Sequence, residues 1–122
     1  MIRVVRLGSP RARGEGLRLG TVRRPPRGVR KADYARRNYY DVWLPELAPS
    51  AQLVTRAQAD WQSFARAYRR EMKAPAAERL LELLARMSHH ADFSVGCYCE
   101  NEERCHRSIL KKLLTGHGAR LA

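Results

Sequence analysis

The chain has 122 residues, and its 24 Lys and Arg against 12 Asp and Glu give a formal net charge of +12. With 44% hydrophobic residues it is long enough to bury one modest core, so residues 1–122 are expected to form a single domain. The apolar runs are far shorter than the roughly 18 residues that span a bilayer, and the first residues lack the apolar centre of a signal peptide. These features exclude transmembrane and secreted classes and predict a cytoplasmic protein without membrane contact.

The basic residues are concentrated in the first third of the chain. Residues 1–37 contain twelve Lys and Arg against two acidic residues, a net charge of +10, whereas the remainder is near balance. Such a field attracts polyanions, so a nucleotide or nucleic acid is the expected partner. The alternative is a compositional bias toward arginine that only raises solubility, and charge alone does not separate the two.

The first part of the chain reads as short strands joined by loops. Residues 2–7 are apolar and β-branched, and residues 17–22 alternate more weakly. Two prolines and a glycine in residues 23–28 exclude both helix and sheet and predict a shaped loop. The aromatic and β-branched run at residues 39–44 predicts a third strand or an extended segment, which Pro45 ends.

The second part of the chain carries helical patterns. Ser50 is expected to cap a short helix that extends to about Ala57, and Asp60 to cap the next one. The apolar face of that second helix consists of Trp61, Phe64, Ala65, Tyr68 and Met72. A third helix is predicted from Pro75 to near Ser88.

The last third alternates strand and helix. Residues 93–97 predict a buried strand, residues 98–103 a polar turn, and residues 105–115 a helix. Residues 119–122 could add an edge strand. Together the elements favour an α/β fold, with a small, mostly parallel sheet covered by helices in a Rossmann-like three-layer arrangement.

Three cysteines and a Cys-His-Arg sequence fall in one segment of 13 residues. Cys97 and Cys99 lie at the carboxyl end of the predicted strand, and Cys105 starts the helix that follows. An odd number of clustered cysteines does not resemble a disulfide framework, so reduced thiols are expected. The start of a helix at the carboxyl end of a parallel strand favours an anion, which would be either a phosphate or a thiolate.

Three hypotheses for this segment remain open at the sequence level. In the first, Cys105 is a thiolate, used as a nucleophile or redox thiol, with His106 as acid or base and Arg104 or Arg107 as a neighbouring cation. Against this, no Cys-x5-Arg loop or Cys-x-x-Cys pair is present, and nearby glutamates oppose a thiolate.

In the second hypothesis, Cys97, Cys99 and Cys105 bind zinc together with His106 or His89, giving a zinc-stabilised interaction module. The Cys-x-Cys spacing and the adjacency of Cys105 and His106 argue against it. In the third, the cysteines are small buried residues, no metal or cofactor is bound, and Arg107 and Ser108 hold the ligand with the helix N–H groups.

The arginine-rich loop is a further candidate for anion binding. Arg23, Arg24 and Arg27 are presented by a loop that prolines stiffen, and guanidinium groups pair well with phosphate oxygens. The alternative is a rigid loop that forms salt bridges to acidic helices. The leading hypothesis is a phosphate-bearing ligand held by Arg23, Arg27, Arg107 and Ser108.

Several motifs together resemble the family called domain of unknown function 488 (DUF488), or YeaO-like. Glu15 to Arg18 is similar to its early Asp-Gly-x-Arg, Arg23 to Gly28 to its Arg-x-Trp-Pro-Arg-Gly, and Trp43 to Ser50 to its Trp-Leu-x-x-Leu-Ala-Pro-Ser. Trp61, Phe64, Tyr68 and the closing Cys105-His106-Arg107 recur likewise. The chain departs from the family at Pro25, where tryptophan is usual, and at Cys99, where many members carry an acidic residue.

The resemblance runs nearly end to end and implies a compact intracellular α/β fold. It further implies that the arginine loop and the Cys-His-Arg turn converge on one pocket. It implies no particular reaction, so a functional hypothesis has to rest on the chemistry of the residues.

Overall fold

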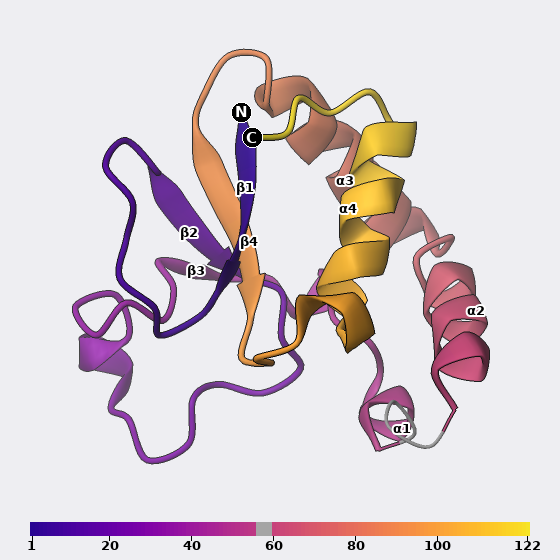
Figure 1. Ribbon diagram of the computed structural model, residues 1–122, viewed down its shortest axis with the longest axis horizontal. Helices are drawn as coiled ribbons and strands as arrows, with labels where there is room; N and C mark the ends of the chain where they lie inside the picture. Colours follow the sequence, from indigo (N-terminus) through magenta and orange to yellow (C-terminus); the bar gives the residue numbers. More distant parts are fainter. Residues whose placement is uncertain (56–59) are drawn as a thin grey trace.

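The protein is described by a computed structural model of residues 1–55 and 60–122 (Figure 1). Its centre is a sheet of four parallel strands in the order β1-β4-β2-β3. The strands are β1 (Ile2–Arg6), β2 (Leu17–Gly20), β3 (Val42–Trp43) and β4 (Phe93–Cys97). Every residue of β4 is buried, as expected for the strand that pairs on both sides. The α/β class with a small parallel sheet is confirmed.

Four α-helices and three short 3-10 helices complete the fold. The α-helices are α1 (Ala51–Val54), α2 (Trp61–Glu71), α3 (Pro75–Met87) and α4 (His106–Gly116). The 3-10 helices are η1 (Lys31–Asp33), η2 (Pro45–Leu47) and η3 (Glu102–Arg104). Helices α2, α3 and α4 lie on the same side of the sheet, and the two chain ends lie side by side next to β1 (Figure 1). None of the described helices is both long and apolar enough to cross a membrane.

The helix starts follow the expected local chemistry. The Ser50 hydroxyl accepts a hydrogen bond from the backbone N–H of Leu53, and the Asp60 carboxylate accepts one from that of Ser63. Pro75 is the first residue of α3, where a missing N–H costs nothing. These side chains satisfy backbone donors that a helix start leaves unpaired, which is why the predicted starts agree with the structure.

Helices and sheet enclose the main core. The buried cluster includes Phe64 and Tyr68 of α2, Leu81 of α3, Leu110 of α4 and Val95 of β4. The periodic aromatic residues of α2 are therefore packing residues, as their spacing predicted. The hydroxyl of Tyr68 donates to the Leu47 carbonyl, so this buried polar atom is satisfied.

Two predicted strands are shorter in the structure. The segment expected at residues 39–44 forms a strand only at Val42–Trp43, although the backbone N–H groups of Asp41 and Leu44 also donate to carbonyls of β2. The edge strand expected at the carboxyl end is a single bridge between Ile2 and Leu121. Helix α1 ends at Val54, and the end predicted near Ala57 lies outside the described residues.

The second face of the sheet is covered by the loops that connect β1, β2 and β3 rather than by α-helices. Its centre is a buried ion pair in which the Arg18 guanidinium donates to both carboxylate oxygens of Glu15, at 2.8 and 3.0 Å. Ser94 of β4 donates to Glu15, and Arg18 donates to the carbonyls of Ser9 and Asn38. Arg18 is 0% exposed, so this polar network attaches the loop layer to the sheet.

Candidate active site

A pocket of about 410 Å³ opens at the carboxyl end of the sheet. The segments that follow β2 and β4 line it, together with the start of α1, the start of α4 and Phe64 of α2. In a parallel sheet the strand ends meet at this edge, so residues distant in sequence converge there. The pocket residues include all three cysteines, His106 and three arginines, Arg23, Arg24 and Arg104.

The three cysteine sulfurs form one cluster. Cys97 ends β4, Cys99 follows it in the loop before η3, and Cys105 caps the start of α4. Their sulfur atoms all lie within 4.8 Å of one another, and those of Cys97 and Cys99 are 3.7 Å apart. Cys97 and Cys105 are buried, whereas Cys99 is exposed. None is in a disulfide, so the site holds three free thiols.

His106 is oriented by a backbone carbonyl. Its Nε2 atom lies 2.7 Å from the carbonyl oxygen of Thr21, and a carbonyl only accepts, so Nε2 carries the proton and donates. Nδ1 is then free to act as a base, and it lies 3.8 Å from the sulfur of Cys105. The ring is buried and packs edge-on against Tyr68, 5.5 Å between centroids. Cys105 therefore has a fixed proton acceptor beside it.

The surroundings of Cys105 stabilise its thiolate. Hydrogen bonds from the thiols of Cys97 and Cys99 lower the pKa of Cys105 below its usual range, and His106 adds to this, although burial opposes it. The same interactions raise the pKa of Cys97 and Cys99, because each thiol keeps its proton to share with Cys105. No side chain caps the N-terminus of α4, so its backbone N–H groups also favour negative charge there. Of the three thiols, Cys105 is therefore the one whose thiolate form these surroundings favour.

The cluster also resembles a set of metal ligands. Within the described ranges, the group of cysteine, histidine and carboxylate ligand atoms that could hold one ion consists of these three sulfurs. A structural zinc site normally takes four protein ligands. The ring of His89 instead contacts the carbonyl of Gly118, 2.8 Å away. Zinc binding, with His106 as the remaining candidate, stays a prediction.

Arg23 lies in the pocket wall but its guanidinium is used within the protein. It donates to the carbonyls of Pro49, Pro45 and Ala48 at 3.0, 3.1 and 3.2 Å. These hydrogen bonds attach the loop to backbone carbonyls, and Arg23 forms no salt bridge with an acidic residue in the described part of the chain. The rigidity expected from the prolines stays a prediction. Arg23 as an anion contact stays a prediction.

Arg107 lies behind the cysteine cluster. It is 3% exposed, its Nη2 donates to the carbonyl of Cys99 at 2.6 Å, and its Nε has no hydrogen-bond partner among the described residues. Ser108 is not among the residues that line the pocket, and its hydroxyl donates to the Cys105 carbonyl at 2.9 Å. Arg107 is thus a buried cation that holds the Cys99 loop, and ligand contacts by both residues stay predictions.

The arginines with free guanidinium groups at the pocket are Arg24 and Arg104. Both are exposed and line the pocket, and neither side chain forms a hydrogen bond or ion pair with residues 1–55 or 60–122. Arg27 is exposed and is not among the pocket residues. Arg24 and Arg104 are therefore the cations best placed for an incoming anion. The sequence did not favour Arg24 over Arg23 and Arg27, because the direction of a side chain in a loop cannot be read from the neighbouring residues.

Two comparisons found nothing and one found a family. No curated protein and no solved structure matches the chain. The family model DUF488-N3a, described as the active DUF488-N3 subclade, matches residues 2–118. The chain belongs to this family. The DUF488 resemblance of the sequence motifs is therefore confirmed, and the DUF488-N3a match includes every residue of the pocket.

Proposed function

We propose that this protein is a cysteine enzyme in which Cys105 is the nucleophile and the substrate carries a phosphate or similar anionic group. The observation that carries the proposal is the orientation of His106. Its Nε2–H is committed to the Thr21 carbonyl, so Nδ1 is the nitrogen that faces the Cys105 sulfur. A nucleophile, an adjacent base and a third group that orients the base are the arrangement on which covalent catalysis depends.

The chemistry follows from these contacts. Nδ1 of His106 takes the proton of Cys105 and leaves a thiolate at the start of α4. The thiolate attacks the electrophilic atom of the substrate, and the proton held at Nδ1 is then available to the leaving group. Cys97 and Cys99 stabilise the thiolate before attack through hydrogen bonds to it. The description of the matched subclade as active supports a catalytic role and names no reaction.

The anionic part of the substrate is assigned to the pocket rim. Arg24 and Arg104 offer guanidinium groups that are free to pair with phosphate oxygens, and they belong to the same pocket as Cys105. A nucleotide or the end of a nucleic acid carries such a group. The enzyme and anion-binding hypotheses thus combine at one pocket, with different arginines from those first favoured by the sequence.

Two alkylating reagents of similar size test the proposal. Iodoacetamide is neutral and iodoacetate is anionic, so the ratio of their rates at Cys105 reports the local charge. We expect Cys105 to react first in the native protein, identified by peptide mapping and by loss of the fast phase in Cys105→Ser. The Arg24→Gln, Arg104→Gln double variant should lower the iodoacetate rate several-fold and leave the iodoacetamide rate nearly unchanged.

The matched control is Arg66→Gln with Arg69→Gln, which removes two exposed arginines of α2 that do not line the pocket. The single variant Arg27→Gln tests the earlier assignment of that residue. An equal effect of the control pair would contradict a specific anion site. A fast phase at Cys97 or Cys99, or stoichiometric zinc in freshly purified protein, would contradict the nucleophile assignment.

A further inference from the structure

Cys105, which is buried, has the exposed thiol of Cys99 beside it, and catalysis by Cys105 and His106 does not need Cys99 as a reacting group. Cys99 is exposed, and its sulfur lies within 4.8 Å of that of Cys105. A disulfide bond is about 2.05 Å long, so the two sulfurs need to approach by less than about 3 Å. Such an approach is within the reach of a loop segment.

The backbone distinguishes Cys99 from Cys97 as the partner. Cys97 is the last residue of β4 and pairs in register with Arg6, and its carbonyl accepts from the N–H of Leu7 at 2.8 Å. Cys99 lies in the connection between β4 and η3, outside any strand or helix. Among the described residues, the carbonyl of Cys99 accepts a hydrogen bond from Arg107, and its backbone N–H donates to the sulfur of Cys97. Cys99 can therefore move toward Cys105 without disturbing the sheet.

We propose that Cys99 is a resolving thiol, which forms a reversible disulfide with Cys105 once a hydroperoxide has oxidised the Cys105 thiolate. The inference rests on the proposed function, since it requires the same thiolate. It adds a redox step to the site that the nucleophile assignment alone does not contain.

The disulfide between Cys99 and Cys105 forms in two steps. The Cys105 thiolate attacks the peroxide O–O bond, a sulfur–oxygen bond forms, and the second oxygen leaves as hydroxide or alkoxide, so that Cys105 becomes a sulfenic acid. The Cys99 thiol then attacks that sulfur, and water leaves with the sulfenic oxygen and the thiol proton. The cysteine pair loses two electrons to the peroxide, and an external dithiol returns them. The disulfide protects Cys105 from irreversible oxidation and switches the nucleophile off.

Buried surroundings favour the resolving reaction. Cys105 is 2% exposed, so its sulfenic acid is reached more readily from within the cluster than by a bulky thiol from solution. The Arg107 contact keeps the Cys99 carbonyl beside the start of α4, which holds the two sulfurs near each other before oxidation. Arg107 is in this sense a positioning residue.

Tryptic cleavage makes the test direct. Cleavage after Arg86, Arg104 and Arg107 gives one peptide of residues 87–104, with Cys97 and Cys99, and one of residues 105–107, with Cys105. The native protein is treated with an equivalent of hydrogen peroxide at pH 7, quenched with N-ethylmaleimide and digested without reduction. We expect the two peptides to be joined and to separate on reduction. The joined mass should be that of both peptides less two hydrogens, plus one N-ethylmaleimide on the cysteine that stays outside the disulfide.

Variants identify the partner. Cys97→Ser should still give the joined peptides, whereas Cys99→Ser should give none and should instead retain a Cys105 sulfenic acid that dimedone traps. Joined peptides in Cys99→Ser, or a disulfide confined to Cys97 and Cys99, would overturn the proposal. So would a Cys105 that oxidises directly to sulfinic acid in the unmutated protein.

The redox inference and the proposed function fail in different ways. If Cys105 alkylates first but gives no disulfide with peroxide, only the resolving role of Cys99 is lost. If Cys105 reacts with both iodoacetamide and peroxide no faster than a denatured cysteine peptide, both are lost. Circular dichroism of each variant before treatment shows that a negative result does not come from unfolding.

Discussion

His106 connects the fold to the chemistry at the level of single atoms. The carbonyl of Thr21 that receives its Nε2–H belongs to the residue following β2, while the sulfur facing Nδ1 belongs to the start of α4. The Thr21 N–H and hydroxyl both donate to the carbonyl of Gly96 in β4, at 3.0 and 2.9 Å. The His106 ring is therefore oriented through Thr21 by the two central strands of the sheet, β2 and β4.

Replacement of His106 by glutamine separates its two roles. The amide N–H of glutamine can still donate to the Thr21 carbonyl, but the base at Nδ1 is lost. We expect His106→Gln to fold and to lower the rate of Cys105 alkylation near neutral pH by at least about tenfold. The rate is measured with iodoacetamide, and His90→Gln, in an exposed loop, is the control. An unchanged rate in His106→Gln would show that His106 is only a packing residue.

Glu15 determines a second property at the residue scale, the acid stability of the fold. Burial alone would raise the pKa of Glu15, but hydrogen bonds from Arg18, Ser94 and the Ala12 backbone outweigh it and lower the pKa to about 2. Because the folded value lies below the unfolded value of 4.5, the ion pair stabilises the protein fully above pH 4.5. This stabilisation is lost as the pH falls from 4.5 toward 2.

Glu15→Gln tests this ion pair. The variant leaves the Arg18 guanidinium buried without its carboxylate, which for such pairs costs about 3–5 kcal/mol. We expect that loss in the free energy of unfolding from urea denaturation at pH 7, and a smaller difference between variant and parent at pH 3. Asp92→Asn, at an exposed carboxylate, serves as the control. A difference that is equal at both pH values would contradict the assignment.

At the scale of elements, the residues of the pocket come mainly from the connections between strands and helices rather than from the strands themselves. The loop after β4 and the start of α4 bring Cys97, Cys99 and Cys105 together, and the segment after β2 adds Arg23 and Arg24. The strands and helices themselves were predictable, because apolar periodicity and capping residues such as Ser50 and Asp60 are local signals. The closeness of the three sulfurs was not, because it depends on how a loop folds back.

Arg18 illustrates the same limit. Its place in a strand could be read from the alternation around it, but its burial could not. The burial of this guanidinium, which is 0% exposed, depends on hydrogen bonds to Glu15 and to the loop carbonyls of Ser9 and Asn38. No local sequence pattern shows that these partners lie beside it. The sequence likewise did not show that the Tyr40 ring, which precedes β3, packs against Gly20 of β2.

Two glycines before β2 provide a matched test of the loop layer. Gly14 and Gly16 have φ angles of +76° and +77°, so alanine strains the backbone at both, by about 1 kcal/mol. At Gly14 a Cβ meets nothing within 4 Å, whereas at Gly16 it would lie 1.9 Å from the carbonyl oxygen of Asp92. We expect Gly16→Ala to lose about 1–3 kcal/mol more than Gly14→Ala in urea unfolding. Equal losses would show that this loop does not contact the start of β4 in solution.

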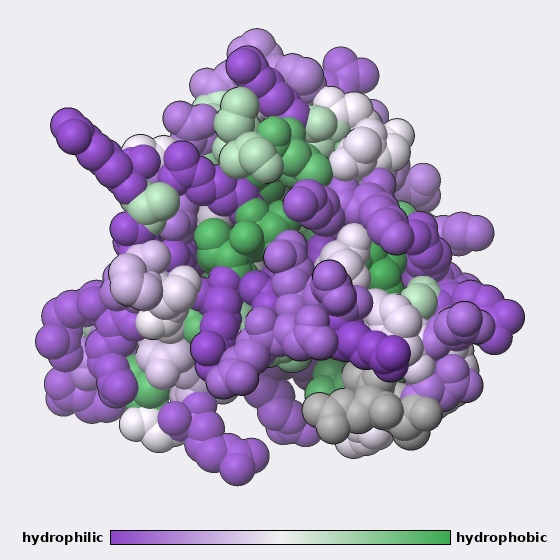
Figure 2. Space-filling model, viewed as in Figure 1, coloured by the Kyte–Doolittle hydropathy of each residue, from purple (hydrophilic) through white to green (hydrophobic). Residues whose placement is uncertain are grey.

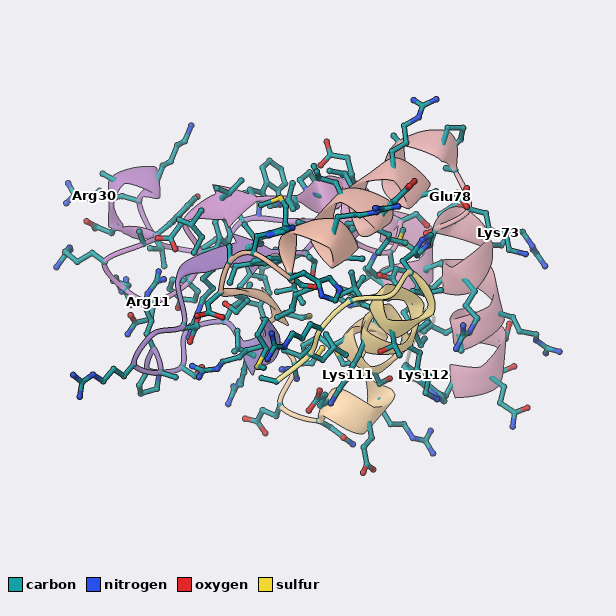
Figure 3. All side chains as sticks on the ribbon, turned by 90° about the horizontal axis from the view of Figure 1, so that it is seen from above. Arg11, Arg30, Lys73, Glu78, Lys111 and Lys112 are labelled. Carbon is teal, nitrogen blue, oxygen red and sulfur yellow. The ribbon has the colours of Figure 1, made fainter. Side chains whose placement is uncertain are left out.

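At the scale of the whole molecule, the three cysteines share one pocket at the carboxyl end of the sheet with the exposed residues Arg24 and Arg104. Hydrophilic residues cover most of the face seen in Figure 2, with hydrophobic residues grouped in its centre. Charged side chains project outward at both ends of the molecule, with Arg11 and Arg30 on the loop layer and Lys73 and Glu78 at the opposite end (Figure 3). Of the described arginines, Arg24 and Arg104 combine free guanidinium groups with a place at the pocket.

Not all of the basic side chains in residues 1–37 are available to bind a ligand. Arg18 forms a buried ion pair with Glu15, Arg11 pairs with Asp41 at 2.8 Å, and Arg23 donates to backbone carbonyls. A count of charges therefore overestimates the cations available to a ligand. Arg24 and Arg104 share their pocket with Cys105, which we propose to be a thiolate.

Titration of that thiolate by its absorbance at 240 nm tests the central claim most directly. Spectra of the reduced protein are recorded from pH 9 down to pH 4, beside those of Cys105→Ser. We expect the unmutated protein to keep the absorbance of one thiolate well below pH 7, and Cys105→Ser to lack that absorbance. Absorbance that disappears near pH 8.5, as for an ordinary thiol, would contradict the account, and so would a low-pH thiolate that persists in Cys105→Ser.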